Sequence, residues 1–310
     1  MKLQNQTIDL IINSLSGYLH GKSNALKLSL ITFFSKGHLL IEDLPGMGKT
    51  TLAIAIAQSL GLDFGRIQCT SDLLPSDITG LSVYNKNTGA FDFYPGPVFN
   101  NIVLVDEINR ATPKTQSALL EAMGEKQSTV EGKTYKMEKP FFVIATQNPV
   151  EQFGTFPLPE SQLDRFTMKI SIGYASRNAE MQILQSGSRR DELYSMQPIL
   201  TKNDCLTIQQ EIKNGIHISE KVLSYILDIV EATRNSKHIL AGISTRGILA
   251  VSATAKVNAY FSGRDFVIPE DVKSLAEYTI PHRTIFREEY DTPGKKEIIL
   301  SLVDKIPAPV

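Results

Sequence analysis

One short stretch, residues 38–60 (HLLIEDLPGMGKTTLAIAIAQSL), limits the folds open to this chain more than any other. A short apolar run leads into a glycine-containing loop that ends in Gly48-Lys49-Thr50, and a helix-like segment follows. Strand, loop and helix in this order are the context of a phosphate-binding P-loop, whose pattern is glycine, any four residues, then Gly-Lys-Ser/Thr. The first glycine position holds Asp43, at the exit of the predicted strand, where a residue other than glycine can be tolerated.

The predicted loop carries the groups that a triphosphate needs. Backbone N–H groups of residues 46–50 can point at phosphate oxygens, and the start of the following helix adds a partial positive charge. Lys49 would hold the β- and γ-phosphates of a nucleotide, and the Thr50 hydroxyl would bind Mg²⁺. The residues expected to contact the nucleotide here are Pro45, Gly46, Met47, Gly48, Lys49, Thr50 and Thr51. The alternative is an ordinary strand, turn and helix with a surface lysine.

A second motif, IVLVDE at residues 102–107, argues against that alternative. Its apolar run predicts a strand covered on both faces, and the acids at its end would lie beside the P-loop. Asp106 would hold Mg²⁺ through its water shell. Glu107 would orient and deprotonate the attacking water, which favours hydrolysis. The structural alternative is an acidic pair that only caps the next element.

The first half of the chain alternates between strand-like and helix-like segments. Strands are expected at 38–43, 65–70, 100–107, 139–148 and 165–172, and helices at 7–19, 23–35, 49–60 and 112–125. In the last helix, Thr112 is predicted as the N-cap and Pro113 as the first residue. This alternation predicts an α/β fold with a parallel sheet. Two further segments, 80–97 and 128–138, have β-prone residues around a turn signal and are predicted to be hairpin insertions.

Amphipathic helices replace this alternation after about residue 175. Apolar residues recur there at spacings of three and four, as in Val222, Ile226, Ile229 and Val230. We therefore expect two domains, which are an αβα nucleotide-binding core with the two hairpins at 1–175 and a small α-helical domain at 176–310.

Charge and composition argue against several other classes of protein. The formal net charge is −1 and no dense Lys/Arg run is present, which makes a nucleic-acid partner an unfavoured interpretation. No apolar run approaches the roughly 18 residues that a membrane span needs, so no membrane insertion is expected. The two cysteines, Cys69 and Cys205, predict no disulfide framework and fit a reducing, cytoplasmic compartment. The histidines lack metal-ligand spacing, so no transition-metal site is expected.

Four stretches of the sequence together resemble the MoxR family of AAA+ ATPases. They are LIEDLPGMGKTTLA, LVDEINRATPKTQSALLEAMGEKQSTVEG, FFVIATQNPVEQFGTFPLPESQLDRF and ISTRG. MoxR-type loops are similar to this one in having a residue other than glycine where Asp43 stands. The resemblance covers nearly the whole chain. It implies a P-loop NTPase αβα sandwich followed by a small all-α lid, with ATP and Mg²⁺ as ligands and a ring oligomer, expected to be a hexamer.

The resemblance also implies roles for residues outside the P-loop. Asn148 matches the sensor 1 residue, which would fix the attacking water; its alternative is a cap on the strand-to-loop turn. Arg165 matches the arginine finger that reaches the γ-phosphate of the neighbouring subunit, with an ion pair to Glu160 as its alternative. Arg110 is a competing candidate for the finger. Arg246 matches sensor 2, donated by the helical domain to the nucleotide of its own subunit, with a solvated helix residue as its alternative.

Two further matches complete the set. His20 and Gly21 stand where such proteins contact adenine, although the family more often has a Val-Gly-Gln-like triplet than His20-Gly21-Lys22. The segments 80–97 and 128–138 match hairpins that mark this AAA+ clade and that contact or remodel partners.

The resemblance implies an oligomeric, chaperone-like ATPase that remodels or matures a partner protein, often one with a von Willebrand factor A domain. Two alternatives stay open. A nucleic-acid motor is suggested by the three lysines and the tyrosine of VEGKTYKMEK, residues 130–139, but the neutral net charge argues against it. The second alternative is a nucleotide switch with little turnover. Glu107 and Arg165 argue against it, because both would serve the chemical step.

Overall fold

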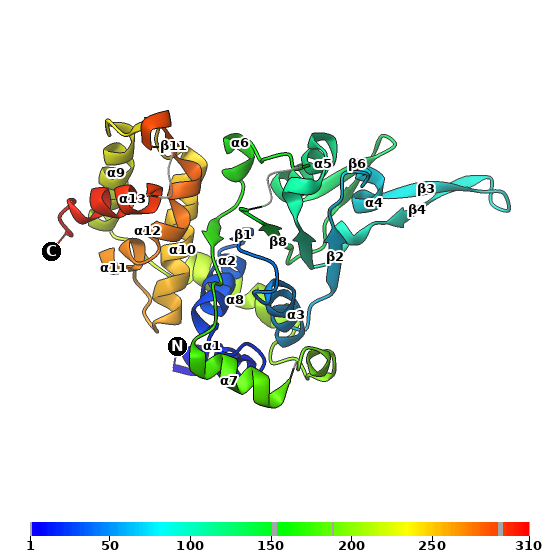
Figure 1. The fold of residues 1–310 in the computed structure, drawn as a ribbon, viewed down its shortest axis with the longest axis horizontal. Helices are drawn as coiled ribbons and strands as arrows, with labels where there is room; N and C mark the ends of the chain where they lie inside the picture. The colour runs from blue at the N-terminus through cyan, green and yellow to red at the C-terminus, as the bar shows by residue number, and fades with distance from the viewer. Residues whose placement is uncertain (1, 151–153, 188, 291–293, 310) are drawn as a thin grey trace.

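A five-stranded parallel sheet forms the centre of the computed structural model, which describes residues 2–150, 154–187, 189–290 and 294–309 (Figure 1). Residues 151–153, part of the third resembling stretch, lie outside the described residues. The strands run in the order β2-β5-β8-β1-β9, and their bounds are Phe64–Gln68, Ile102–Asp106, Phe142–Gln147, Leu39–Glu42 and Met168–Ile170. The predicted parallel α/β fold is therefore confirmed.

The direction of the strands gives the sheet two different edges. Leu39 pairs with both Ile144 and Met168, and Gln68 pairs with Asp106, so equivalent ends of the strands align. We call the side where residues 43, 106–107, 148 and 171–173 leave the strands the carboxyl edge. The side where residues 38, 101, 141 and 164–167 enter them is the amino edge. In open parallel sheets, ligands bind at the carboxyl edge.

Side chains of the central strands alternate between two apolar cores. Leu39, Ile41, Ile102, Leu104, Phe142 and Ile144 belong to one buried cluster, whereas Leu40, Val103, Val105, Val143 and Ala145 belong to the other. Successive side chains of a strand point to opposite faces, so an unbroken apolar run is what a sheet covered on both faces requires.

Helices cover both faces. The first core also includes apolar residues of α1 (Lys2–Ser16), α2 (Ser23–Phe34), α3 (Lys49–Ser59) and α8 (Lys202–Gly215). The second core includes those of α4 (Pro75–Thr79) and α5 (Pro113–Glu125). Thr112 accepts a hydrogen bond from Thr115 N–H and Pro113 opens α5, as predicted.

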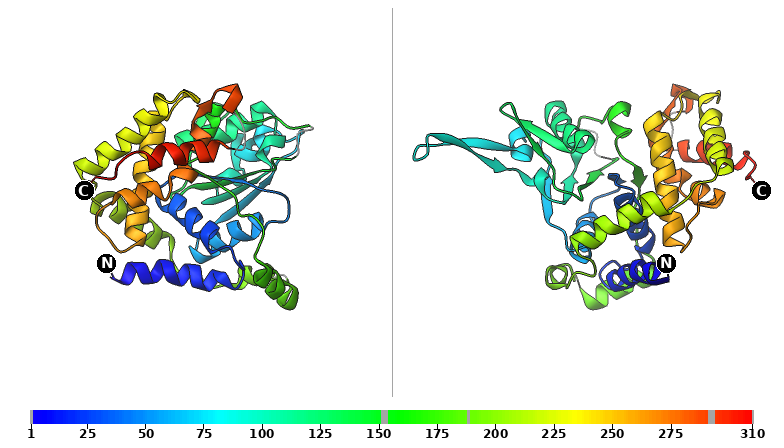
Figure 2. Two further views of the ribbon diagram at one scale, coloured as in Figure 1. Left: turned by 60° about the vertical axis from the view of Figure 1, so that its left-hand side comes forward. Right: turned by 180° about the vertical axis from the view of Figure 1, so that it is seen from behind.

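Two hairpins leave this core, at the predicted places. β3 (Gly80–Asn85) pairs with β4 (Ala90–Pro95) in an arm that projects far from the rest of the chain (Figures 1 and 2). β6 (Gln127–Val130) pairs with β7 (Lys133–Lys136) directly after α5. The rings of Phe93 and Tyr135 stack at 3.9 Å between centroids and join the two hairpins. At the base of the arm, a Cβ added to Gly80 would lie 2.1 Å from Tyr94 O, so the backbones there are in close contact.

The C-terminal part is a helical lid that packs beside the sheet (Figure 1). It contains α9 (Glu220–Arg234), α10 (Thr245–Phe261), α11 (Pro269–Lys273), α12 (Ala276–Thr279) and α13 (Lys295–Asp304), with the short pair β10 (Ile239–Ala241) and β11 (Ile285–Phe286). Before the lid come α6 (Glu160–Leu163) and α7 (Arg177–Ser186). The first core holds residues from both sides of position 175, so the domain boundary predicted there stays a prediction.

Within the described part of the chain, no helix is both long and apolar enough to cross a membrane. Cys69 and Cys205 are buried and unpaired.

Candidate nucleotide-binding site

The P-loop lies at the carboxyl edge, between β1 and α3. Gly46 and Gly48 have φ values of 84° and 91°, in the left-handed region that favours glycine. A Cβ added to either would meet no atom within 4 Å, so the backbone conformation, not crowding, calls for glycine. Gly48 is the N-cap of α3, and Lys49 is its first residue. The loop therefore turns its backbone toward the start of a helix, as an anion site requires.

Asp43 is buried and holds two parts of the site together. Its carboxylate accepts a hydrogen bond from Ser171 Oγ at 2.8 Å and another from the N–H of Ile172. The N–H of Gly173 lies 3.3 Å from both carboxylate oxygens. The side chain thus binds the segment that follows β9.

Lys49 lies among acids. Its Nζ donates to the Asp43 backbone oxygen at 2.6 Å. Burial lowers the pKa of Lys49, while the carboxylates of Asp43, Asp106 and Glu107 act to raise it. The lysine and the acidic pair, predicted from two separate motifs, are therefore close enough to interact.

The Asp106 carboxylate is engaged on both oxygens. Arg66 Nε, from the neighbouring strand β2, donates to Oδ2 at 2.8 Å, and Thr146 Oγ1 donates to Oδ1 at 3.3 Å. No sequence motif pointed to Arg66. The alternation of residues along an edge strand places Arg66 and Gln68 on one face, but only the strand order puts that face beside Asp106.

Glu107 adopts an unusual backbone conformation, with φ at 57°. Its N–H donates to Thr146 Oγ1 at 2.9 Å. Its Oε2 accepts from Gln68 Nε2 at 3.3 Å and from Arg110 Nη1 at 3.0 Å. A non-glycine residue held at positive φ by its surroundings is typical of functional sites. Arg110, a candidate finger, thus contacts the acid of its own chain.

Asn148 follows β8 at the same carboxyl edge. Its Oδ1 accepts from Val150 N–H at 3.2 Å, so in this structure it caps the turn after the strand. Its proposed contact with an attacking water stays a prediction.

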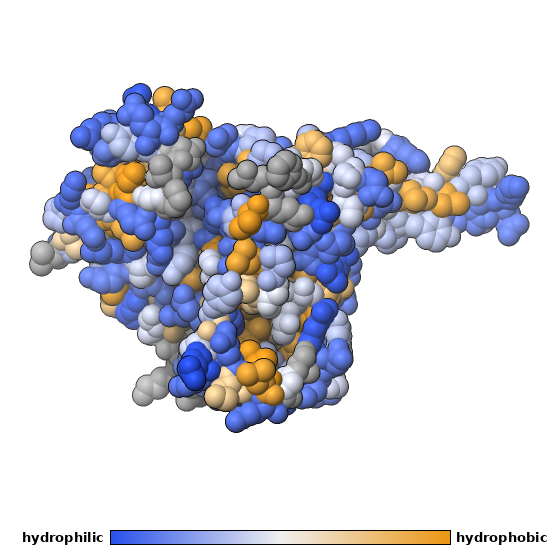
Figure 3. Space-filling model, in the orientation of Figure 1, coloured by the Kyte–Doolittle hydropathy of each residue, from blue (hydrophilic) through white to orange (hydrophobic). Residues whose placement is uncertain are grey.

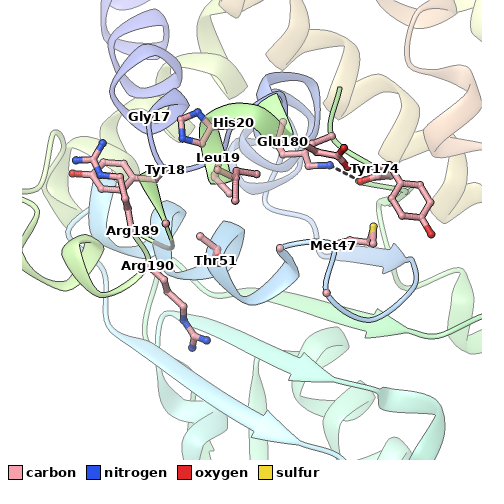
Figure 4. Close-up of a pocket in the computed structure, with 17 residues that line it drawn as sticks. Gly17, Tyr18, Leu19, His20, Met47, Thr51, Tyr174, Glu180, Arg189 and Arg190 are labelled. Carbon is pink, nitrogen blue, oxygen red and sulfur yellow. Dashed lines mark hydrogen bonds between the residues drawn. The ribbon is translucent and has the colours of Figure 1, made fainter. Parts of the chain in front are cut away.

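A cavity of about 320 Å³ lies beside the P-loop (Figure 4). Of the predicted residues, it is lined by His20, Gly46, Met47, Gly48 and Thr51. Pro45, Lys49, Thr50 and Gly21 do not line it. A Cβ added to Gly21, whose φ is 70°, would lie 3.2 Å from Ala179 Cβ, so Gly21 packs against α7 instead.

Other lining residues were not predicted. They are mainly Tyr18, Gly173, Tyr174, Glu180, Arg189 and Arg190. The Arg189 guanidinium lies beside the Tyr18 ring (Figure 4), 4.9 Å from its centre. Glu192 accepts a hydrogen bond from Arg189 Nη2 at 2.6 Å. These residues belong to no motif, and only the packing of α7 and the following loop against the loop between α1 and α2 brings them together.

Arg165 and Arg246 lie at the opposite, amino edge of the sheet. Arg165 Nη1 donates to the backbone oxygen of Leu120 in α5. The neighbouring Asp164 accepts from Arg246 Nη1 at 3.2 Å, from Ser244 Oγ at 3.0 Å and from Arg283 Nη1 at 2.6 Å. The start of α10 is thereby fixed next to the residues that enter β9.

Arg246 therefore lies away from the P-loop of its own chain in this structure, and its proposed role toward a nucleotide stays a prediction. Residues 38–43 run alongside residues 167–172, so five residue steps separate the amino edge from the P-loop. At about 3.3 Å per residue, that is a distance of roughly 16 Å. Within one chain, Arg246 contacts Asp164 and not the P-loop.

Comparisons with known proteins agree with the motifs. Residues 38–168 match the model of the ATPase family associated with various cellular activities (AAA), and residues 231–301 match the AAA lid domain. The chain is 45% identical over 292 residues to the uncharacterized protein YeaC of Bacillus subtilis, covering 94% of this chain and 91% of that protein. It is 37% identical to Chaperone MoxR1 of Mycobacterium tuberculosis, covering 90% of this chain and 76% of that protein.

A solved structure is similar over nearly its whole length. The crystal structure of a candidate ATPase from Cytophaga hutchinsonii superposes with a TM-score of 0.91 at 40% identity. The match covers 99% of this chain and 96% of that one.

Proposed function

Because this chain belongs to the MoxR family of AAA+ ATPases, we propose that it binds ATP with Mg²⁺ and hydrolyses the ATP to ADP and phosphate. We propose further that it works as a ring of subunits, a hexamer, and that it remodels or matures a partner protein. The name of one relative, Chaperone MoxR1, supports the chaperone-like part of this proposal.

One arrangement carries the enzymatic part: Lys49, at the start of α3, and the acids Asp106 and Glu107, at the end of β5, lie at the same carboxyl edge, and the two carboxylates act to raise the pKa of Lys49. The lysine would offset the negative charge of the β- and γ-phosphates. The backbone of residues 46–50 would bind the remaining phosphate oxygens at the start of α3. In this arrangement the phosphates would lie within reach of the two acids.

Magnesium fits the oxygen atoms available there. The Thr50 hydroxyl, in the first turn of α3, and the Asp106 carboxylate are hard ligands of the type that Mg²⁺ prefers. Thr50 would bind the ion, and Asp106, whose two oxygens each already accept a hydrogen bond, would hold it through its water shell. When bound, it would neutralise charge on the phosphates.

Glu107 would act as the general base. Gln68 and Arg110 both donate to its Oε2, so Oε1 can accept a proton from water without breaking either bond. The resulting hydroxide would attack the γ-phosphorus, with ADP as the leaving group. Asn148, at the end of the adjacent strand, would help to orient that water.

Arg165 and Arg246 support a ring, because both lie at the amino edge, away from the P-loop of their own chain. If the amino edge of one subunit faced the carboxyl edge of the next, both guanidinium groups would approach the neighbour's phosphates. A cation placed there stabilises the charge that develops in the transition state.

The β3–β4 arm supports contact with a client protein. Tyr84, Phe91 and Tyr94 on this arm are between 53% and 60% exposed. Hydrophobic residues also show among polar ones on the surface of the projecting arm (Figure 3). Following the family resemblance, we propose a protein with a von Willebrand factor A domain as the partner. The two buried, unpaired cysteines are compatible with the cytoplasm, where we propose that the protein works.

Mixing two inactive variants tests this function. Arg165→Ala should bind ATP but hydrolyse it roughly 10³-fold more slowly, as for other arginine fingers. Glu107→Gln should also bind ATP and lose roughly 10²–10⁴-fold in turnover. In a mixed ring, the intact Arg165 of one variant can face the intact Glu107 of the other, so phosphate release should partly return.

Arg110→Ala provides the matched control. Because Arg110 contacts Glu107 of its own chain, mixing this variant with Glu107→Gln should restore nothing. Failure of the Arg165→Ala and Glu107→Gln mixture to regain activity at every ratio would show that Arg165 does not act between subunits. Wild-type protein that released no phosphate from ATP with Mg²⁺ would refute the ATPase proposal.

A further inference from the structure

The P-loop has Asp43 where the pattern has glycine, and the contacts of Asp43 in the structure suggest a role for this acid. An unpaired carboxylate beside bound phosphates would repel them. Asp43 does not have the positive φ of Gly46 and Gly48, so its backbone conformation does not call for glycine. The presence of an acid at this position must therefore be explained by the contacts of its carboxylate.

The Asp43 carboxylate binds three consecutive residues, which are Ser171, Ile172 and Gly173. Their donors are one hydroxyl and two backbone N–H groups. Only 7% of Asp43 is exposed, so water competes little for these bonds. Hydrogen bonds to an ionised acceptor are about twice as strong as those between neutral groups. The charge is thus satisfied by the segment after β9.

Gly173 is also held from the other side. Lys22 Nζ, from the loop between α1 and α2, donates to the Gly173 backbone oxygen (Figure 4). Burial lowers the pKa of Lys22, while the carboxylates of Asp43 and Glu180 act to raise it. We call Asp43, Gly173 and Lys22 the Gly173 clamp, since one residue is held at its N–H by the P-loop and at its C=O by the α1–α2 loop.

The Gly173 clamp fixes one wall of the cavity described above. Gly173 and Tyr174 line that cavity together with Gly46 and Gly48 of the P-loop. Two residues later, Ser176 accepts from Ala179 N–H and caps α7, which contributes Glu180 to the same lining. The clamp therefore joins the P-loop to the wall that the sequence motifs did not reveal.

We propose that Asp43 is a positioning residue, which orders residues 171–174 against the P-loop before a nucleotide arrives. This inference rests on the proposed function, because it takes a nucleoside di- or triphosphate as the ligand. Without the carboxylate, the wall would have to be ordered upon binding, at a cost in affinity. The cost should apply equally to ADP and ATP, because the clamp does not involve the γ-phosphate. The chemical step should be spared, because the carboxylate has no bond to Glu107 or Lys49 Nζ.

Asp43→Gly and Asp43→Asn test the proposal. The glycine variant restores the usual P-loop pattern and keeps the backbone oxygen that Lys49 contacts; the asparagine variant keeps the shape and removes the charge. Glu42→Gln is the matched control, because Glu42 also links β1 to β9, through a 2.6 Å ion pair with Lys169, yet has no bond to residues 171–173. Calorimetric titration with ADP, steady-state kinetics with ATP, and hydrogen exchange without nucleotide would be measured on each.

Both Asp43 variants should bind ADP about tenfold more weakly and raise KM for ATP by a similar factor, with kcat within about threefold of the wild type. The amides of Ile172 and Gly173 should exchange at least tenfold faster in the nucleotide-free protein. Glu42→Gln should change the affinity less than twofold.

Wild-type affinity in Asp43→Gly, or a loss in kcat with unchanged affinity, would overturn the proposal. An equal loss of affinity in Glu42→Gln would overturn it as well, since general loosening between β1 and β9 would then explain the effect. If the wild type bound no nucleotide, the proposed function would fall. Exchange at Ile172 and Gly173 would still decide whether the clamp exists, and unchanged exchange in both Asp43 variants would refute it.

Discussion

Replacing Arg283 with methionine should destabilise this protein far more than the same replacement of Arg246, although both arginines pair with Asp164. The Arg283 side chain is 1% exposed, and its Nη1 lies 2.6 Å from Asp164 Oδ1. The Arg246 side chain is 57% exposed, and its Nη1 lies 3.2 Å from the other carboxylate oxygen. One carboxylate thus provides a buried and an exposed ion pair for comparison.

The magnitudes follow from what each variant leaves behind. Removing one partner of a buried ion pair costs about 3–5 kcal/mol, whereas an exposed pair contributes about 0–1 kcal/mol. Arg283 also donates to the backbone oxygens of Asp164 and Phe166, but Phe166 O keeps a second donor in His282 Nε2. Burial lowers the pKa of Arg283 to about 10, although Asp164 acts to raise it. The ion pair with Asp164 therefore offsets only part of the free energy that the guanidinium loses on leaving water. We therefore expect the lower value, about 3 kcal/mol.

Urea unfolding of the nucleotide-free protein at pH 7 would measure both variants. Far-UV circular dichroism is the suitable signal, because the sequence contains no tryptophan. Arg283→Met should lower the free energy of unfolding by about 3 kcal/mol, and Arg246→Met by less than about 1 kcal/mol. Equal losses in the two variants would refute the argument that burial decides the strength of each contact.

Two further predictions follow from single side chains. Lys49→Ala should weaken binding of ATP and ADP in a calorimetric titration, because it removes a cation from a site with three acids nearby; equal affinities would contradict its assignment. His38 is buried and neutral, and burial lowers its pKa to about 4, while Val143 N–H donates to Nδ1 and Nε2 donates to Met123 O. Below pH 6.5 this histidine takes up a proton in the unfolded chain but not in the folded chain, so His38 alone should lower the stability by about 3 kcal/mol between pH 6.5 and 4. His38→Gln should reduce the pH dependence of the urea-derived stability over that window. The part due to His282, whose pKa burial lowers well below 6.5, should remain, and identical slopes in variant and wild type would exclude His38 as a cause.

Much of the core could be predicted from the sequence because its signals are local. The apolar runs at 38–43, 100–107 and 139–148 became strands because each supplies side chains for both cores. The N-cap Thr112 and the turn signals of the two hairpins act within a few residues of themselves. The MoxR-type AAA+ assignment is confirmed for the same reason, since its motifs are continuous in the sequence.

What the sequence could not supply are contacts between distant segments. Arg66 lies beside Asp106 only because β2 is the neighbour of β5. Arg246 was expected near the nucleotide of its own chain, and its contact with Asp164 depends on how the lid packs. Arg189 and Tyr174 reach the cavity through the fold of a segment without any motif. In each case the partner is tens of residues away, and no periodicity encodes the pairing.

The β3–β4 arm offers a practical consequence. Its base is closely packed at Gly80 and Gly96, whereas a Cβ added to Gly89 at its tip would meet no atom within 4 Å. Residues can therefore be removed from or added to the tip without touching the core, provided that they come in pairs across the strands so that each side chain keeps its face. Each such pair changes the length of the arm by about 3.4 Å. Variants with stepwise changes in the length of the arm could therefore show how far from the core a partner bound by the arm is held.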